Sequence, residues 1–189
     1  MKDAFNVGAS ASATVSGSRS TDDRVRMGGI YTTECRDKDG NLKWRDVSHN
    51  LVTNAGENYG ADVTLSGGSQ ITTWYVGLMA ASPTPADADT MSSHAGWTEF
   101  TAYDESVRQT WTDAGPSGGV VTNTASTADF TVSTNSSSIG GAFLTSDSTK
   151  SGTSGTLFSA VAFSGGNKAA DDGDTLSVTY QFTFADDGA

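Results

Sequence analysis

Residues 175–184, TLSVTYQFTF, alternate strictly between polar and apolar side chains, and no other feature of the chain limits its fold as much. The apolar positions are Leu176, Val178, Tyr180, Phe182 and Phe184. A period of two residues indicates a β-strand that is buried on one side and solvated on the other. The chain must therefore build a sheet with an apolar face, and a second layer must cover that face.

Similar short runs recur along the chain between clusters of Gly, Asn, Asp and Ser. Residues 28–37 and 42–47 flank the turn sequence Asp37–Asn41, which contains Asp-Gly, and we expect them to form a β-hairpin. Residues 155–164 show the same alternation. Strands at short spacing with turn signals between them predict a mainly β fold. We expect an antiparallel β-sandwich or barrel-like domain with one or two short helices and an extended N-terminal arm.

Two segments have weaker helical signals. Thr53 or Asn54 can cap a short helix that runs through Asp62, although two glycines weaken it. One helical turn is expected to begin at Thr84–Pro85, because Pro is favourable at the first helical position behind a Thr cap.

The composition divides the chain into residues 1–26 and residues 27–189. Ser, Ala, Gly and Thr dominate the first part, a composition typical of linkers. It is interpreted either as a disordered tail or as a flexible or extended arm that orders against a neighbouring subunit. In the second interpretation Phe5, Val7 and Val15 are its anchors. Residues 27–189 are expected to form the β-sandwich domain.

Residues 71–111 hold three of the four Trp residues and are expected to form the structural centre. The predicted core comprises Trp74, Val76, Trp97, Phe100, Phe158, Val161, Val178, Tyr180 and Phe182. The loop between the strands of this stretch is expected to be ordered by side-chain hydrogen bonds and to lie near a subunit interface. Its candidate interface residues are Pro83, Pro85, Asp87, Asp89 and His94.

The charge of the chain bears on its partners. The formal net charge is −11 and the pI is about 4.3. Because binding to phosphates needs an excess of Lys and Arg, we expect neither nucleic acid nor anionic membranes as partners. An acidic exterior also keeps a protein soluble, and that explanation is equally open. No stretch is long or apolar enough to cross a membrane, and no apolar signal-peptide region is evident, so synthesis in a cytoplasm is expected.

Motifs that carry chemistry are scarce, and we expect neither an enzyme nor a cofactor or metal site. Cys35 is the only cysteine, so no intrachain disulfide can form. The chain has no Gly-rich phosphate loop, no Cys/His metal spacing and no nucleophile elbow. The acidic spacing from Asp37 to Asn41 resembles the start of a calcium loop, but a plain turn is the simpler interpretation. His49 and His94 are the only histidines.

A sugar-binding or sugar-cleaving site remains an alternative. Glu99, Asp104 and Glu105 lie near aromatic residues that can stack on sugars. The competing interpretation is that these aromatic side chains fill the core.

Four runs of the sequence resemble a family of structural proteins from tailed bacteriophages. They are TECRDKDGNLKWRDVSHNLVTNAGENY, WYVGLMAAS, ADTMSSHAGWTEF and SGTSGTLFSAVAFSGGNKAADDGDTLSVTY. The resemblance covers roughly residues 28–180, and residues 90–99 are its most specific part.

The resemblance implies a virion component without catalytic residues. The favoured role is a capsid decoration (cement) protein that binds the major capsid protein on the outer head surface and bridges capsid subunits. Such proteins are often homo-oligomers, and a trimer is favoured. The alternative is a tail or fibre module that binds a host receptor or carbohydrate. We favour decoration because the chain is short and has no long fibrous or repetitive stretch.

Overall fold

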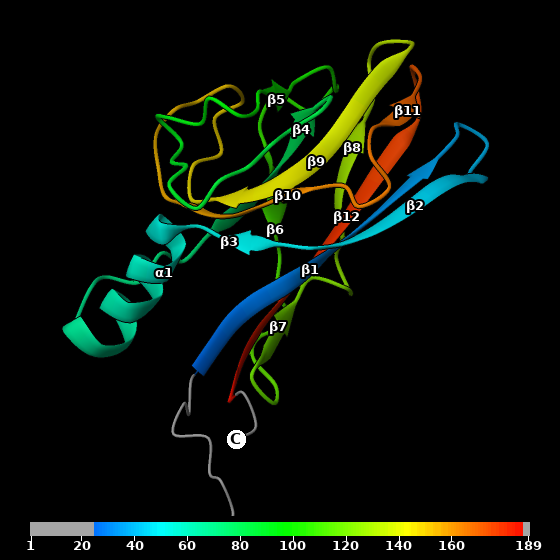
Figure 1. The fold of residues 1–189 in the computed structure, drawn as a ribbon. Coiled ribbons are helices and arrows are strands. Elements are labelled where there is room, and N and C mark those ends of the chain that lie inside the picture. The colour runs from blue at the N-terminus through cyan, green and yellow to red at the C-terminus, as the bar shows by residue number, and fades with distance from the viewer. Residues whose placement is uncertain (1–24, 187–189) are drawn as a thin grey trace, which may run out of the picture.

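The computed structural model describes residues 25–186, which form two antiparallel β-sheets packed face to face with one short α-helix (Figure 1). The first sheet has the order β2-β1-β12-β7, and β8 also pairs with β12. Its strands are β1 (Val25–Arg36), β2 (Leu42–His49), β7 (Val120–Thr122), β8 (Ala128–Thr131) and β12 (Thr175–Asp186). The predicted mainly β, sandwich-like fold is thus confirmed.

The second sheet has the order β3-β10-β9-β4-β5, with β11 on β9 and β6 on β4. Its strands are β3 (Leu51–Val52), β4 (Trp74–Ala80), β5 (Glu99–Phe100), β6 (Gln109–Trp111), β9 (Ser137–Thr145), β10 (Leu157–Ala162) and β11 (Lys168–Ala170). Strand β4 lies inside this sheet between β9 and the pair β5 and β6, as its nearly continuous apolar sequence predicted.

Strands β1 and β2 form the predicted hairpin, with Ile30 opposite His49. Its turn depends on Asp37, whose Oδ1 accepts the backbone N–H groups of Asp39 and Asn41 at 2.9 and 2.8 Å. Gly40 follows with φ of +85°, a conformation that glycine adopts without strain. The acidic side chain at 37 therefore bonds to the turn's own backbone.

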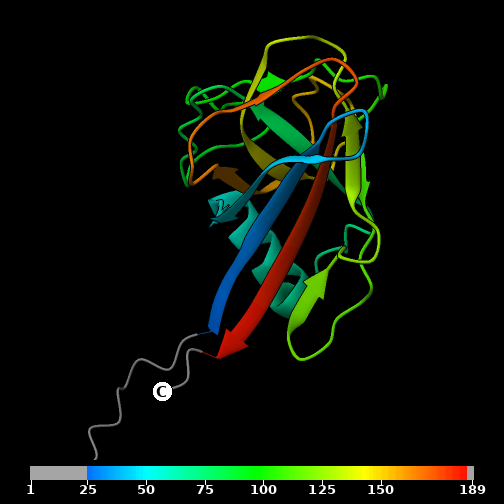
Figure 2. The ribbon, with the colours of Figure 1, turned by 90° about the vertical axis from the view of Figure 1, so that its right-hand side faces the viewer.

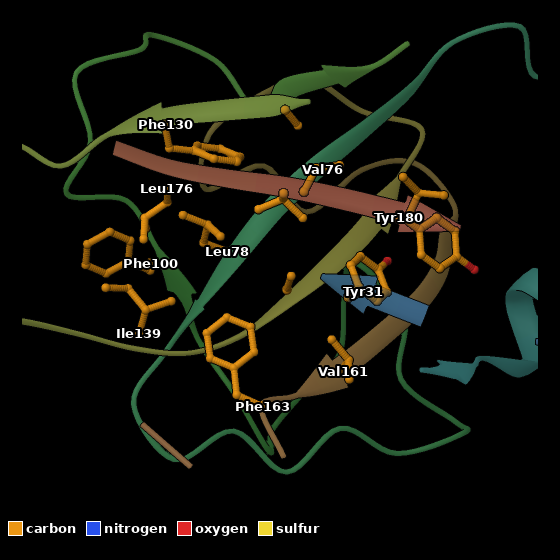
Figure 3. Close-up of a cluster of buried hydrophobic side chains, with 14 of the residues drawn as sticks. Tyr31, Val76, Leu78, Phe100, Phe130, Ile139, Val161, Phe163, Leu176 and Tyr180 are labelled. Atoms are coloured by element: carbon orange, nitrogen blue, oxygen red, sulfur yellow. The ribbon is translucent and has the colours of Figure 1, made fainter. Parts of the chain in front are cut away.

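The main core lies between the two sheets (Figure 3). Tyr31 of β1 and Tyr180 of β12 stack there with ring centroids 4.3 Å apart, and both are fully buried. Of the predicted core residues, Val76, Trp97, Phe100, Phe158, Val161, Val178 and Tyr180 are buried. Trp74 and Phe182 are only partly buried and pack against the edge of the core.

A second apolar cluster occupies the opposite face of the second sheet. It contains Met79, Met91, Trp97, Phe143, Leu157 and Ala160. Met91 and Trp97 come from the loop of residues 81–98, which covers this face. The second sheet is therefore buried on both faces, and this explains the nearly continuous apolar sequence of β4 and of residues 139–144 in β9.

The helical turn predicted at Thr84–Pro85 is wrong, because the segment has no helix. The backbone N–H of Asp89 donates to the carbonyl oxygen of Ala86, and the Asp89 carboxylate accepts the N–H of Ala86. The carboxylate also accepts the indole N–H of Trp97 at 2.9 Å. These bonds fix a tight turn beneath Trp97 instead of a helix.

The predicted short helix is present as α1 (Asn54–Ala61), and it continues into a π-helical turn, η1 (Asp62–Ser66). Thr53 is the N-cap: its Oγ1 accepts the N–H of Gly56 and donates to the Leu157 carbonyl oxygen. A Cβ on Gly56 would lie 2.2 Å from the carbonyl oxygen of Phe158, so glycine allows the helix to lie directly on β10. Packing thus outweighs the poor helix propensity of glycine.

Replacing Thr53 with alanine is expected to lower the free energy of unfolding by about 1–2 kcal/mol, because the helix loses its cap and a buried hydroxyl contact. Thr53→Ser keeps the hydroxyl and should retain most of the stability. Urea unfolding followed by far-ultraviolet circular dichroism measures both. Equal losses in the two variants would contradict a capping role.

Strands β1 and β12 each span 12 residues and pair along their whole length, from Val25 opposite Asp186 to Arg36 opposite Thr175. The ends of both strands near Val25 project below the sandwich as a ribbon, and β7 pairs with its β12 side at residues 181–183 (Figures 1 and 2). Strand β1 begins slightly before the predicted boundary at residue 27, because β12 provides pairing partners for residues 25 and 26.

Candidate functional site

A groove with a volume of about 520 Å³ opens where the ribbon leaves the sandwich. The groove is lined by the end of α1 with η1, residues 70–74, strands β1 and β12, the segment from β6 to β7, and one residue each from β9 and β10, Leu144 and Phe158. The lining residues include Met27, Tyr59, Val63, Ile71, Trp74, Trp111, Pro116, Val121, Phe158, Tyr180, Phe182 and Phe184. We call this feature the basal groove.

Aromatic rings build the wall of the basal groove. Tyr59 packs edge-on against Trp74 with ring centroids 5.2 Å apart, and Trp74 packs against Phe158 at 5.3 Å. Phe158 in turn meets Phe182 at 5.3 Å. Such edge-to-face contacts hold the rings in fixed orientations. The groove is therefore a preformed apolar surface.

The groove exists because the apolar face of the ribbon is longer than the sheet that covers it. Tyr180 is fully buried, Phe182 is partly buried, and Phe184 on the same face is 46% exposed. Met27 lies opposite Phe184 and also lines the groove, and Val25 beyond it is 62% exposed. Exposed apolar residues gathered on one face in this way are typical of interaction sites.

Charged groups in the basal groove are few. Its lining includes the polar side chains of Thr64, Gln70 and Thr72, and among the described residues that line it Asp113 alone is charged. Leu65, which is 86% exposed, lies in η1 beside the lining residues Val63 and Thr64. Away from Asp113, a charge that an occupant places inside the groove would have no opposite charge among the described lining residues, so the aromatic part of the site favours an uncharged segment.

The predicted interface loop is held by side-chain hydrogen bonds, as expected. Asp89 bonds to Trp97, and His94 stacks on the Trp97 ring with centroids 3.8 Å apart. Pro83 and Asp89 are buried, Pro85 and His94 are half-buried, and Asp87 is exposed. The loop therefore directs much of its predicted contact surface inward, as the cover of the second sheet. Its place at a subunit interface stays a prediction.

Phe5, Val7 and Val15, the predicted arm anchors, lie outside the described residues. His49 is exposed on β2, whereas His94 is packed in the loop of residues 81–98. The structure therefore assigns the two histidines to different elements.

Two of the three carboxylates considered for sugar chemistry, Glu99 and Glu105, are bound to other groups of the chain, whereas Asp104 is exposed. Both Glu105 oxygens accept the backbone N–H of Thr131. Glu99 forms a two-point ion pair with Arg108, with Nε to Oε1 at 2.9 Å and Nη2 to Oε2 at 2.8 Å. The aromatic rings of Trp97 and Phe100, 5% and 8% exposed, cannot stack on a sugar from solvent.

Arg108 is a buried organising residue that sequence reasoning missed. Its side chain is inaccessible to solvent, and its remaining N–H groups donate to the carbonyl oxygens of Asp147 and Gly152 at 2.9 and 2.8 Å. The guanidinium also lies 5.2 Å from the centre of the Phe143 ring. Arg108 thus joins β5, the start of β6 and the loop after β9. Nothing in its local sequence, ESVRQTW, indicates burial.

Asp46 is a second buried carboxylate with an organising role. Its oxygens accept hydrogen bonds from the Ser48 hydroxyl and the backbone N–H groups of Ser164 and Gly165, and Lys168 lies 3.4 Å away. Burial raises the pKa of Asp46, but these hydrogen bonds outweigh burial and hold its pKa below the usual value of an aspartate. Asp46 therefore joins β2 to the turn after β10 in its charged form.

Low pH should remove the contribution that the charged Asp46 carboxylate makes to the free energy of unfolding. Because the pKa of Asp46 is lower in the folded state, its stabilisation is present above the unfolded-state pKa of about 4 and disappears as the pH falls through the folded-state pKa. Asp46→Asn is expected to cost roughly 1.5–3 kcal/mol near neutral pH. The difference from the parent protein should shrink below about pH 4. Urea unfolding of both proteins from neutral pH to below about pH 4 measures this difference, and Asp172→Asn, at an exposed aspartate, is the control. A difference independent of pH would contradict the assignment.

Cys35 is buried beside Asp174, with Sγ 3.8 Å from the carboxylate. Burial, followed by the negative charge of Asp174, raises the pKa of the Cys35 thiol to about 12. The thiol therefore stays protonated and has little reactivity toward thiol reagents at neutral pH.

Within residues 25–186 the structure brings no three His, Cys, Asp or Glu side chains together in a group that could hold a metal ion. In the same range no helix has both the length and the apolar character to cross a membrane. Comparison of the chain with protein-family models, curated proteins and solved structures found no match.

Proposed function

We propose that this protein is a non-enzymatic structural subunit of a tailed-bacteriophage particle, a decoration protein that binds the outer head surface and bridges capsid subunits. The observation that carries the proposal is the uncovered apolar end of the molecule: Val25, Leu65 and Phe184 are exposed around or beside the basal groove. The sequence resemblance to phage structural proteins supplies the kind of partner.

The arrangement of the chain supports docking through this end. Both ends of the described chain, Val25 and Asp186, lie at the tip of the ribbon. The segments that precede and follow them are therefore attached beside the groove. In the sandwich above, the Arg108–Glu99 ion pair is buried, and Lys168 of the second sheet pairs with Asp46 of the first. The protein thus combines a β-sandwich with an exposed apolar surface at one end, through which it would dock.

The proposed mechanism depends on many copies of the protein binding to a repeating capsid lattice. Each copy makes a contact of modest area with the major capsid protein, and many copies bind one repeating lattice. Where a copy, or a homo-oligomer such as the favoured trimer, spans two capsid subunits, their separation must break several contacts at once. The protein would then stabilise the head without any chemical step.

The first test is the number of copies and their position on purified particles. Hundreds of copies on the head, measured by quantitative mass spectrometry and located by electron microscopy, are expected. A handful of copies at the tail, or binding of the isolated protein to host cells, would contradict the proposal and favour a tail or fibre module.

A second test addresses the docking surface. The double substitution Val25→Asp with Phe184→Asp should weaken binding to capsids by about tenfold or more, since loss of buried apolar anchors costs more than 1 kcal/mol each. Leu42→Asp with Val107→Asp is the matched control, because these residues are similarly exposed but do not line the groove. Equal binding of the two variants would place the contact elsewhere.

A further inference from the structure

The basal groove lies next to the point at which residues 1–24 join the body. Strand β1 begins at Val25, and Met27, two positions later, is part of the groove lining. Any apolar stretch in residues 1–24 is thus tethered close to an uncovered apolar surface. Tethering raises the effective concentration of such a stretch to about the millimolar range, so even a weak contact becomes populated.

The sequence of the tethered segment has the pattern that this groove needs. From residue 5 to residue 16, FNVGASASATVS, apolar and polar or glycine residues alternate without exception. The apolar positions are Phe5, Val7, Ala9, Ala11, Ala13 and Val15. In an extended chain these side chains share one face.

Charge supports the same match. Residues 4–18 contain no Asp, Glu, Lys or Arg, although 17% of the whole chain is charged. The groove itself has a single charged lining residue, Asp113. An uncharged segment can therefore enter without the cost of burying an unpaired charge.

The connecting residues are sufficient for the chain to turn back. Residues 16–24, SGSRSTDDR, are rich in Ser, Gly and Asp, which favour turns. Nine residues span at most about 30 Å when fully extended. This length allows the segment to reverse at the tip of the ribbon and return along the groove.

We propose that in the free protein residues 5–15 bind as an extended segment in the basal groove of their own chain, with Phe5, Val7 and Val15 facing its aromatic wall. In that position the segment covers the apolar stripe of Phe182, Phe184 and Met27. This inference concerns the isolated protein and does not depend on the partner named in the proposed function.

The experiment uses a spin label on the full chain. Ser10→Cys provides the attachment point on the polar face of the segment, and buried, protonated Cys35 should remain unlabelled, which labelling of the parent protein verifies. The readout is the indole N–H signal of each tryptophan in an isotope-labelled sample. Trp74 and Trp111 line the groove, whereas Trp44 and Trp97 do not and serve as internal controls.

We expect the signals of Trp74 and Trp111 to lose most of their intensity while those of Trp44 and Trp97 are retained. Loss in none of the four, or equal loss in all four, would overturn the proposal. A mixture of spin-labelled copies with separate isotope-labelled copies distinguishes the source of the segment. Loss in that mixture at the same level would assign the groove to a second copy and overturn occupancy by the same chain.

Two double variants test whether the odd-numbered side chains of residues 5–15 face the groove. Phe5→Asp with Val7→Asp should restore the signals of Trp74 and Trp111, because it places two charges against the aromatic wall. Asn6→Asp with Ser12→Asp adds the same charge to the opposite face and should leave the loss unchanged. The same response to both pairs would refute binding through the odd-numbered face. Particle binding is not measured here, so a negative result leaves the proposed function intact.

Discussion

Replacing Arg108 with methionine is expected to lower the free energy of unfolding by about 3–5 kcal/mol, the largest effect of any substitution considered for this protein. The reason is that the substitution leaves Glu99, the partner of Arg108, as a buried and unpaired charge. Glu99 has a side chain that is 7% exposed, and without the guanidinium its charge keeps only the N–H of Ser151 as a close donor among the contacts of the described residues. The carbonyl oxygens of Asp147 and Gly152 lose their donors as well.

The control for this prediction is an arginine with the same partner type on the surface. Arg36 pairs with Glu34 at 3.0 Å, but the two side chains are 47% and 31% exposed. Arg36→Met should therefore cost no more than about 1 kcal/mol. Chemical unfolding of both variants gives the comparison, and a similar cost at the two sites would contradict the role of burial.

A double variant distinguishes the contribution of the ion pair to stability from the contribution of the volume that its two side chains fill. Arg108→Met combined with Glu99→Leu removes both charges and replaces them with apolar volume. Buried pairs exchanged in this way are often neutral or even stabilising, so the double variant should recover much of the stability that Arg108→Met loses. A double variant as unstable as the single one would show that the bonds from Arg108 to the loop carbonyl oxygens dominate.

The second large effect is expected at Gly56. Alanine there improves the helix propensity by about 1 kcal/mol, but its Cβ would lie 2.2 Å from the backbone oxygen of Phe158, which cannot move without shifting β10. Overpacking of this kind typically costs about 1–3 kcal/mol, and a backbone contact is at the upper end. We therefore expect Gly56→Ala to lower the free energy of unfolding by about 2 kcal/mol in spite of the propensity gain.

Gly60 in the same helix is the matched control. A Cβ there would meet the terminal carbon of Met27 at 2.7 Å, the mobile end of a flexible side chain. Met27 can move away at little cost, so Gly60→Ala should be neutral or stabilising by up to about 1 kcal/mol. Thermal unfolding of the two variants measures the sign directly. Destabilisation of both by the same amount would mean that helix docking does not distinguish the sites.

The sequence was most informative where the relevant physics is local. The alternation at residues 175–184 predicted β12, and Asp-Gly at residues 39–40 predicted the hairpin turn, because strand period and turn chemistry depend on near neighbours. Thr53, the helix cap, was one of the two caps predicted for the same reason. The second helical turn was wrong, because the Asp89 carboxylate binds groups that a helical pattern does not anticipate.

Long-range partners account for what the sequence did not predict. The alternation in β12 predicts the same burial for Phe184 as for Leu176. Which of the two is buried depends on how far the facing sheet extends along β12. The basal groove results from that difference and has no local signature. Arg108 is similar: its burial depends on Glu99 and on a loop more than 35 residues later, so a lone Arg in a polar stretch resembles a surface residue.

The pairing of β1 with β12 also determines when the protein can fold. Among the described strands, β12 alone joins β1 and β2 to β7 and β8, and it is the last of them to leave the ribosome. Until it is synthesised, the inner faces of β1, β4 and β9 have no complete facing layer. Contacts between the two ends of a sequence also slow folding, typically to milliseconds or longer. We therefore expect the two-sheet domain to complete its folding only after β12 has been synthesised.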